Sequence, residues 1–160
     1  MPKTIVNISD AKVSNNPEDV LVTFSLGSCI GVCLYDRTVQ TGGMLHYLLP
    51  NSAENVRKAK QKPFMYADTG MELLLGKLLS MGTNKKKMQV IIAGGAATLK
   101  VIAKGFDIGK RNYLAIRKIL WSNGMFINAE EIGDSSPRTL YMNIADGTVT
   151  ISSKGMKKSL

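Results

Sequence analysis

The chain has 160 residues, of which 44% are hydrophobic, 6% aromatic and 21% charged, and its formal net charge is +9. These values are typical of one globular domain with its own core, and we predict a single domain over residues 1–160. The N-terminus lacks the apolar segment of a signal peptide, and no apolar run is long enough to cross a membrane. We therefore expect a cytoplasmic protein without membrane insertion.

The basic residues are spread along the chain, with the densest runs at 57–62, 85–87 and 154–158. Aromatic residues do not interleave with these runs, so we do not expect a surface on which nucleic-acid bases stack. An acidic protein partner fits the positive charge better. Two cysteines without a signal peptide also argue against a disulfide framework.

The first third of the chain is predicted to contain strands, because its apolar runs are short and rich in β-branched residues. Gly27-Ser28 separates the second strand from the third, and Pro50 follows the fourth. The third and fourth are close enough in sequence to form a hairpin. The four predicted strands cover residues 4–9, 20–24, 29–36 and 42–49.

Helices are predicted at 66–81 and 108–122, where apolar residues recur at helical spacing. The polar and basic stretch 51–63 before the first helix is predicted to be a mobile surface loop. Residues 96–103 are predicted to form a short helix or an irregular loop. The apolar stripe of the second helix is predicted to contain Leu114, Ile116, Ile119 and Leu120.

Strands are also predicted at 88–93 and 126–132. A further pair at 138–144 and 148–153 flanks Asp146-Gly147, a strong turn dipeptide, and predicts a hairpin. The basic tail 154–160 is predicted to be flexible. Strands at both ends with two helices between them indicate a layered α/β domain with a mixed sheet.

Cys29 is the first candidate catalytic residue, because it directly follows Gly27 and Ser28. Backbone N–H groups beside such small residues are accessible, and they can lower the pKa of a thiol and hold an oxyanion. We therefore predict that the backbone of Gly27 and Ser28 supports the site. A free cysteine is more commonly a small buried hydrophobic residue, and we predict that role for Cys33.

His46 is the only histidine of the chain, and it is therefore the only ordinary side chain that accepts a thiol proton near neutral pH. A thiol and one imidazole are the minimum for nucleophilic attack on an amide. Met44 and Leu48 share its strand face, so a buried structural histidine is the alternative. Thr23 is the third candidate: beside the histidine strand it would orient the imidazole, although β-propensity alone also explains a threonine there.

Two other chemistries use the same residues. Cys29, Cys33 and His46 would supply three metal ligands without a clear fourth. A thiol–disulfide switch between the two cysteines would lack the Cys-x-x-Cys spacing. We predict neither a metal nor an organic cofactor.

Longer motifs around these residues are similar to those of a known family. The candidates have the spacing Thr23-x5-Cys29-x16-His46, within Leu26-Gly27-Ser28-Cys29-Ile30-Gly31-Val32-Cys33-Leu34-Tyr35-Asp36. Further matches are His46-Tyr47-Leu48-Leu49-Pro50, Tyr66-Ala67-Asp68, Gly94-Gly95-Ala96 and Ile108-Gly109-Lys110-Arg111-Asn112. Over residues 15–145 the chain resembles the CheD family of chemoreceptor glutamine deamidases.

The resemblance implies a protein-glutamine glutaminase, an amide hydrolase that converts receptor glutamines to glutamates through a thioester and releases ammonia. Cys29 would be the nucleophile, His46 the base and Thr23 the residue that orients the base. The implied fold is α/β, a single layered α/β/β domain with mixed sheets and two main helices, related to the bacterial toxin deamidases.

The resemblance also implies partners. These are the cytoplasmic helices of methyl-accepting chemotaxis receptors and a CheC-type CheY-P phosphatase. The alternative function is therefore a regulatory protein that docks on receptors and on this phosphatase, with catalysis secondary.

The partner-binding surface is predicted at Phe106, Asp107 and Ile108. The aromatic residue lies between Gly105 and Gly109, in a segment too polar and glycine-rich for a core helix. The alternative is that Phe106 anchors this loop to the core.

The loop 133–138 departs from the family pattern. Gly133 and Arg138 are present, but Asp134 and Pro137 stand where small, flexible residues are common. This difference affects the predicted loop conformation and partner contacts, and leaves the three candidate catalytic residues in place.

Overall fold

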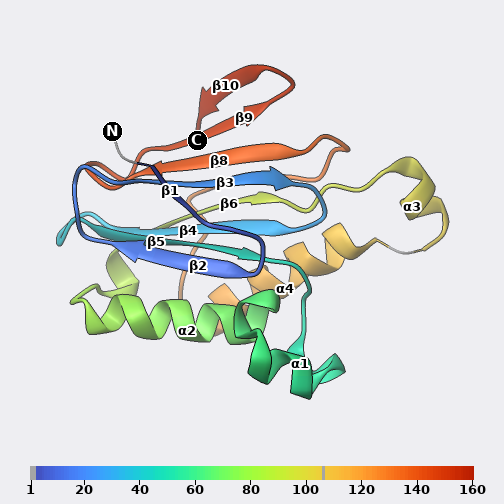
Figure 1. Cartoon of the computed structure of the whole chain (residues 1–160), viewed down its shortest axis with the longest axis horizontal. Coiled ribbons are helices and arrows are strands. Elements are labelled where there is room, and N and C mark those ends of the chain that lie inside the picture. Colours follow the sequence, from blue (N-terminus) through green and yellow to red (C-terminus); the bar gives the residue numbers. More distant parts are fainter. Residues whose placement is uncertain (1–2, 106) are drawn as a thin grey trace.

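The computed structural model describes residues 3–105 and 107–160. Two five-stranded sheets pack on each other, and helices cover the outer face of one of them (Figure 1). The layers therefore follow the order helix, sheet, sheet, which confirms the predicted α/β/β class.

The first sheet joins the beginning of the chain to its end, in the spatial order β1-β3-β8-β9-β10. β1 pairs with β3 in parallel, and the other neighbouring strands pair antiparallel. The predicted hairpin around Asp146-Gly147 is confirmed as β8 and β9. The strands are β1 Lys3–Ile5, β3 Val20–Leu26, β8 Arg138–Asn143, β9 Val149–Ser153 and β10 Met156–Ser159.

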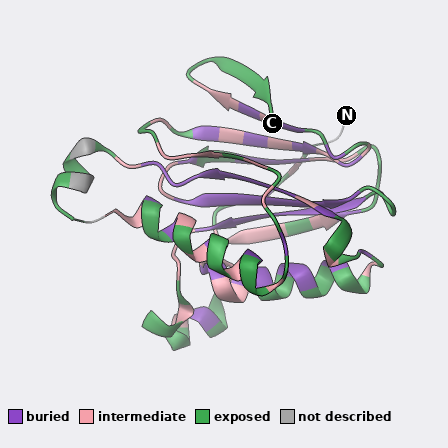
Figure 2. Cartoon of the chain, turned by 180° about the vertical axis from the view of Figure 1, so that it is seen from behind, coloured by how far each residue is buried: buried purple, intermediate pink, exposed green. Residues whose placement is uncertain are grey.

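The second sheet lies between the first sheet and the helices, in the order β2-β5-β4-β6-β7. Every residue of β4 and of β5 is buried, as Figure 2 shows for the middle of the domain. β4 and β5 form the predicted antiparallel hairpin, and β7 joins β6 in parallel. The strands are β2 Asp10–Ser14, β4 Ile30–Asp36, β5 Thr41–Tyr47, β6 Met88–Gly94 and β7 Ala129–Ile132.

Two long helices, α2 (Ala67–Ser80) and α4 (Ile108–Ser122), agree with the predicted helices. The predicted stripe of α4 is only partly correct, because Leu114 is 51% exposed and Ile119 is partly buried. Gly109, Asn112, Ile116 and Leu120 are the buried residues instead, at the spacing of three and four that keeps one helical face on the sheet. The remaining helices are short: η1 Ser52–Glu54, α1 Val56–Gln61, η2 Pro63–Met65, η3 Lys85–Lys87 and α3 Leu99–Ala103.

The hydrophobic core has two parts. One lies between the helices and the second sheet and includes Val32, Leu45, Leu74 and Ile116. The other lies between the two sheets. Its members come from both ends of the chain, and they include Leu26, Cys29, Cys33, Met44, Ile91, Leu140 and Met142.

Three segments differ from the sequence-based predictions. The strand predicted at 4–9 ends at Ile5; the chain then turns at Ser9 (φ 60°) and continues from Asp10 as β2 in the other sheet. The strand predicted at 126–132 begins only at Ala129. The basic tail, predicted to be flexible, forms β10 and pairs with β9.

The predicted mobile loop at 51–63 is also wrong, because this segment is mostly helical. The Asn51 side chain accepts a hydrogen bond from the Ala53 N–H, and Asn55 caps α1 in the same way at Lys58. Only Ala59 is buried in α1, so the segment has no apolar period to reveal its helices.

Candidate functional site

Cys29 lies on the connection between the two sheets. β3 of the first sheet ends at Leu26 and β4 of the second begins at Ile30, so the candidate nucleophile sits where the chain crosses. The cysteine is 7% exposed and belongs to the buried cluster between the sheets. Cys29 is thus buried between the end of β3 and the start of β4, and the loop that joins these strands determines its position.

A bulge in β3 turns both Thr23 and Leu26 toward the interior. The register of β3 against β8 shifts between these residues, and Ser25 adopts a φ of 56°. Without the extra residue, strand alternation would place only one of the two in the interior. The bulge therefore buries the Thr23 hydroxyl beside the second sheet and leaves the chain directed toward Cys29.

The backbone of the Cys29 loop is fixed by the end of β6. Gly95 N–H donates to Cys29 O (2.9 Å), and Ala96 N–H donates to Gly27 O (2.8 Å). Gly94 has a φ of 117°, and a Cβ at this position would lie 2.1 Å from Cys29 O. A glycine is therefore required for this close approach of the two backbones.

Thr23 and His46 are in direct contact, as predicted. Thr23 Oγ1 lies 2.7 Å from His46 Nδ1 and 2.7 Å from Val6 O. The single hydroxyl hydrogen of Thr23 goes to Val6 O, which accepts only. Nδ1 must then donate its hydrogen to Thr23 Oγ1, and this tautomer leaves a lone pair on Nε2.

His46 Nε2 is buried and has no hydrogen-bond partner within the described residues. An unsatisfied buried acceptor in a native fold points to a function that needs it free. Strand register places Cys29 close by, because His46 pairs with Gly31, and Cys29 lies two residues before Gly31. Cys29 itself lies on the connection just before β4, and only a glycine stands directly opposite His46 in the strand pair.

Burial keeps both groups neutral. It raises the pKa of the Cys29 thiol, an effect that the residue's own backbone N–H opposes in part. It lowers the pKa of His46 to about 4. The prediction that the loop amides lower the thiol pKa is therefore wrong in its net direction, since loss of hydration outweighs them.

Cys33 is a core residue, as predicted. It is 1% exposed and pairs with Met44 and Ile91 in the second sheet. Burial raises its thiol pKa far above the ordinary value. Both cysteines are free thiols.

Asn112 is a functional candidate that the sequence analysis did not single out. Its side-chain amide donates to Ser28 O and to Leu48 O, both at 2.9 Å. It thereby joins the loop before Cys29 to the residues that follow β5, two residues after His46. Tyr47 Oη also donates to the backbone oxygen of Asn112 (2.5 Å). The sign available in the sequence was a polar residue four positions before Ile116, on the apolar face of the predicted helix.

A hollow of about 260 Å³ opens beside the cysteine loop, between the loop, α3 and the start of α4. Gly27 and Ser28 line one side, and Ile108 and Gly109 line another. Within the described part of the chain, the backbone N–H of Ser28 donates no hydrogen bond. This amide is available to an oxygen that enters next to Cys29.

The predicted partner surface is described only in part, because Phe106 lies outside the described residues. The Asp107 side chain accepts a hydrogen bond from Lys110 N–H (3.0 Å) and thereby caps α4. Ile108 is the first residue of this helix and lines the hollow beside Ser28.

Arg138 is buried and supports the same region. Its guanidinium donates to Gly133 O (2.7 Å) and to Gly94 O (3.3 Å). The loop 133–138, whose sequence departs from the family pattern, is therefore tied to the glycine that backs Cys29.

Two further properties concern metal and membrane. Across residues 3–105 and 107–160, no three His, Cys, Asp or Glu side chains gather where they would hold a metal ion. No helix in the same residues is long and apolar enough to span a membrane.

Comparison with known proteins gives one consistent result. Residues 48–153 match the family model described as CheD chemotactic sensory transduction. The chain is 47% identical over 155 residues to the probable chemoreceptor glutamine deamidase CheD 1 of Syntrophus aciditrophicus (strain SB), covering 97% of this chain and 96% of the relative. It is 41% identical over 160 residues to the probable chemoreceptor glutamine deamidase CheD of Solibacter usitatus (strain Ellin6076), covering 100% and 94%. The family model begins after His46, whereas these two relatives are matched over the region that contains all three candidate residues.

Proposed function

Because this chain belongs to the CheD family, we propose that it deamidates glutamine side chains of chemoreceptors with Cys29 as nucleophile, His46 as general base and Thr23 as the residue that orients the base. The observation that carries the proposal is the contact between Thr23 and His46 (2.7 Å), which leaves Nε2 buried, unprotonated and without a hydrogen-bond partner among the described residues.

The first half of the reaction forms a thioester. The Cys29 sulfur attacks the carboxamide carbon of the substrate glutamine, and His46 Nε2 takes the thiol proton. The carbonyl oxygen becomes an oxyanion, which accepts hydrogen bonds from the backbone N–H of Ser28 and Cys29. The imidazolium then returns its proton to the nitrogen, the C–N bond breaks and ammonia leaves.

The second half restores the enzyme. Water enters the place that ammonia leaves, and His46 Nε2 takes a proton from it as it attacks the thioester carbon. The C–S bond breaks and the thiolate takes the proton back from the imidazolium. The products are a glutamate side chain and the free thiol, so each cycle consumes one glutamine and one water.

Because Cys29 and His46 are both neutral before the substrate binds, the thiol proton is transferred during the attack itself. Cys29 has a raised pKa and His46 a lowered one, so a thiolate–imidazolium pair does not form in advance. The proton leaves the thiol as the sulfur attacks, and the charge that then develops on the imidazole is stabilised by Thr23 Oγ1 at Nδ1.

The direct test uses a purified cytoplasmic fragment of a chemoreceptor from the same organism. Mass spectrometry after incubation should find the amide-to-acid mass change at specific glutamines, with equivalent release of ammonia. The Cys29→Ala protein is the control and should leave every glutamine intact. Unchanged glutamines with the folded wild-type protein, or equal conversion by Cys29→Ala, would contradict the proposal.

The site of action and the second partner belong to the same proposal. The protein acts in the cytoplasm, where the receptor signalling helices lie. A CheC-type phosphatase is a predicted second partner at Phe106, Asp107 and Ile108. Co-purification with and without Phe106→Ala tests that contact, and retained binding by a folded variant would argue against this surface.

A further inference from the structure

A series of hollows follows one side of α4, from its C-terminal end to the cysteine loop. The largest, about 740 Å³, lies between α4 and residues 125–130. It shares Tyr113 with a second hollow of about 410 Å³. The second shares Ala97 and Ser135 with the hollow that contains Ser28. α4 has 15 residues and is therefore about 22 Å long, so the hollows connect a distant surface to Ser28, the residue before the candidate nucleophile.

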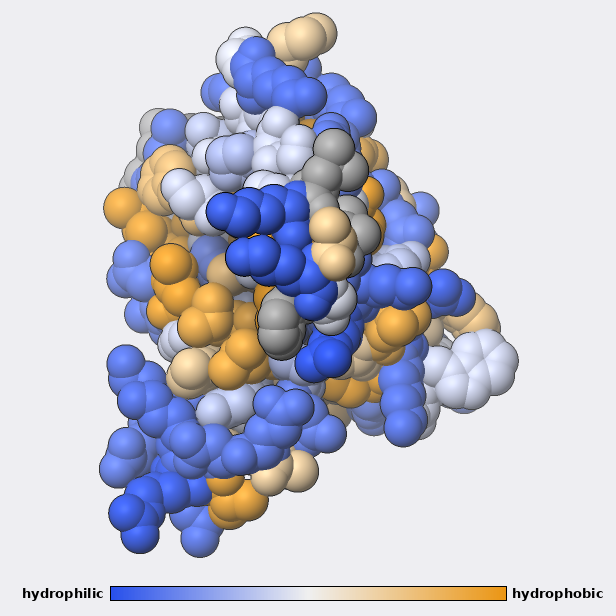
Figure 3. All heavy atoms as spheres, turned by 90° about the vertical axis from the view of Figure 1, so that its right-hand side faces the viewer, coloured by the Kyte–Doolittle hydropathy of each residue, from blue (hydrophilic) through white to orange (hydrophobic). Residues whose placement is uncertain are grey.

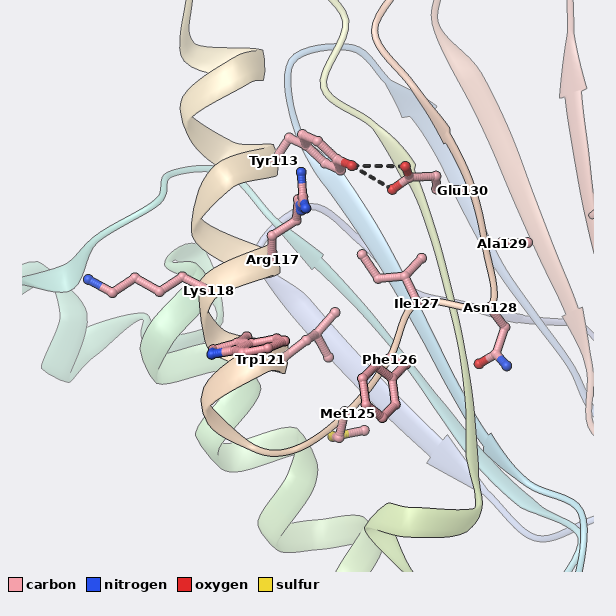
Figure 4. A pocket seen from close by; sticks show the side chains of 11 residues that line it. Tyr113, Arg117, Lys118, Trp121, Met125, Phe126, Ile127, Asn128, Ala129 and Glu130 are labelled. Atoms are coloured by element: carbon pink, nitrogen blue, oxygen red, sulfur yellow. Dashed lines mark hydrogen bonds between the residues drawn. The ribbon is translucent and has the colours of Figure 1, made fainter.

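We call this surface the α4 groove and define it by Lys110, Tyr113, Arg117, Trp121, Phe126 and Ser135. Its wide end presents two exposed aromatic side chains, Trp121 on α4 and Phe126 on the segment after it (Figure 4). They are 77% and 74% exposed. Large aromatic residues are costly to leave in water and are enriched at the centre of protein interfaces.

The helix side of the α4 groove is positively charged. α4 contains Lys110, Arg111, Arg117 and Lys118 and no acidic residue. No ion pair of these four side chains occurs among the described residues; the Arg117 guanidinium lies 5.6 Å from the centre of the Tyr113 ring. Figure 3 views the molecule from the side on which α3 lies in Figure 1, and this side carries many hydrophilic side chains around smaller hydrophobic areas.

The acidic residues of the groove already have partners. Both carboxylate oxygens of Glu130 lie 2.8 Å from Tyr113 Oη, which donates its one hydrogen to them. Asp134 lies 3.8 Å from Lys154 Nζ, and Asp107 caps α4. At the wide end, Arg117 and Lys118 stand against the single carboxylate of Glu130, and this excess of positive charge favours an acidic ligand there.

We propose that the α4 groove binds an acidic amphipathic helix, whose apolar residues cover Trp121 and Phe126 and whose carboxylates pair with Lys118 and Lys110. We identify this helix as the receptor helix that carries the substrate glutamine, and this identification rests on the proposed function. Binding along the groove holds the helix while its glutamine enters beside Ser28. Interactions away from the reacting amide supply the binding energy that a single glutamine side chain lacks.

Trp121 is the only tryptophan of the chain, so its fluorescence reports this contact directly. The inactive Cys29→Ala protein is titrated with a tryptophan-free cytoplasmic receptor fragment. Burial of the indole should shift its emission to shorter wavelength. Lys118→Glu and Phe126→Ala, each introduced into Cys29→Ala, should weaken binding by about tenfold or more. Lys77→Glu, an equal charge reversal at an exposed position of α2, should leave the affinity unchanged.

The two proposals fail in different ways. If the fragment is deamidated at the same kcat/KM by wild type, Lys118→Glu and Phe126→Ala, the α4 groove is not the docking site and the proposed function stands. If the emission shift and the charge effect occur but no glutamine changes, the docking stands and the proposed function fails. An unchanged emission spectrum, equal weakening by Lys77→Glu, or tighter binding of single-stranded RNA than of the fragment would overturn the docking proposal.

Discussion

Thr23 and His46 lie on strands of different sheets, and their side chains meet with 2.7 Å between Oγ1 and Nδ1. Since the Thr23 hydrogen goes to Val6 O, the threonine acts only as an acceptor toward the imidazole. The contact therefore fixes the tautomer that has its free lone pair on Nε2.

Replacing Thr23 by valine removes this acceptor and keeps the shape of the side chain. We expect Thr23→Val to lower kcat by roughly tenfold or more, and His46→Ala to lower it by roughly a hundredfold or more, because only the latter removes the base. Thr23→Ser keeps the hydroxyl and should remain close to wild type. Single-turnover deamidation of the receptor fragment measures all three, and equal rates for Thr23→Ser and Thr23→Val would remove Thr23 from the mechanism.

Replacing each cysteine by alanine should distinguish the catalytic thiol from the structural one. Cys29→Ala should abolish deamidation and lose about 1 kcal/mol of unfolding free energy, because the thiol is 7% exposed and belongs to the buried cluster between the sheets. Cys33→Ala should keep substantial activity and lose about 1 kcal/mol of unfolding free energy, since it leaves a small cavity between the sheets. Ammonia release and urea denaturation on the same preparations measure both quantities. An inactive Cys33→Ala together with an active Cys29→Ala would reverse the assignment.

The lowered pKa of His46 should appear in the pH profile. The base must be neutral, so kcat/KM should decline through about pH 4 rather than near the ordinary value of about 6.5. Circular dichroism at each pH distinguishes acid unfolding of the protein from titration of His46. An acid limb with its midpoint near 6.5 in the folded protein would show that burial does not control this group.

The same shift has a consequence for stability. Below about pH 6.5 the unfolded chain protonates His46, while the folded chain resists protonation down to about 4. The stabilisation is therefore complete above the unfolded pKa and is lost as the pH falls through this window. His46→Gln should reduce the slope of unfolding free energy against pH between these values, as measured by urea denaturation. An unchanged slope would contradict the shift.

Asn112 should affect catalysis by holding the cysteine loop in position relative to the strand of His46. Asn112→Ala removes the donors to Ser28 O and Leu48 O, so we expect a loss of about 1–3 kcal/mol in stability. The loop before Cys29 also loses its connection to the strand of His46, and kcat should fall more than KM changes. Leu114→Ala, an exposed position on the same helix, is the control. A destabilised Asn112→Ala with wild-type kcat below its melting temperature would limit the residue to a structural role.

The sequence predicted most of this fold because most elements carry a local period. α4 was predicted with its observed bounds, and the β4–β5 hairpin followed from two apolar runs joined by a short turn. The short helices at 52–65 were missed because side-chain caps and Pro63 form them without an apolar face. β10 was missed because its residues are exposed, and its pairing with β9 is a backbone property.

The site was predictable in its residue types and only partly in its arrangement. Residue type singled out Cys29 and His46, the resemblance to the CheD family added weight to Thr23, and the structure shows the contact between Thr23 and His46. Burial could not be inferred, so the direction of the Cys29 pKa was wrong. The role of Asn112 depends on contacts with atoms more than sixty residues away in the sequence, and no local sequence pattern reveals contacts over such a separation.

The cysteine loop is the crossing point of the chain between its two sheets, and we therefore expect heat to affect the site before it affects the strands. Thr23 stays with one sheet and His46 with the other, so a small sliding of the layers would separate acceptor from imidazole while every strand remained paired. Thermal inactivation should therefore precede the loss of secondary structure. Mutations deep between the sheets, such as Leu140→Ala, should widen the interval between the two temperatures even though they touch no substrate.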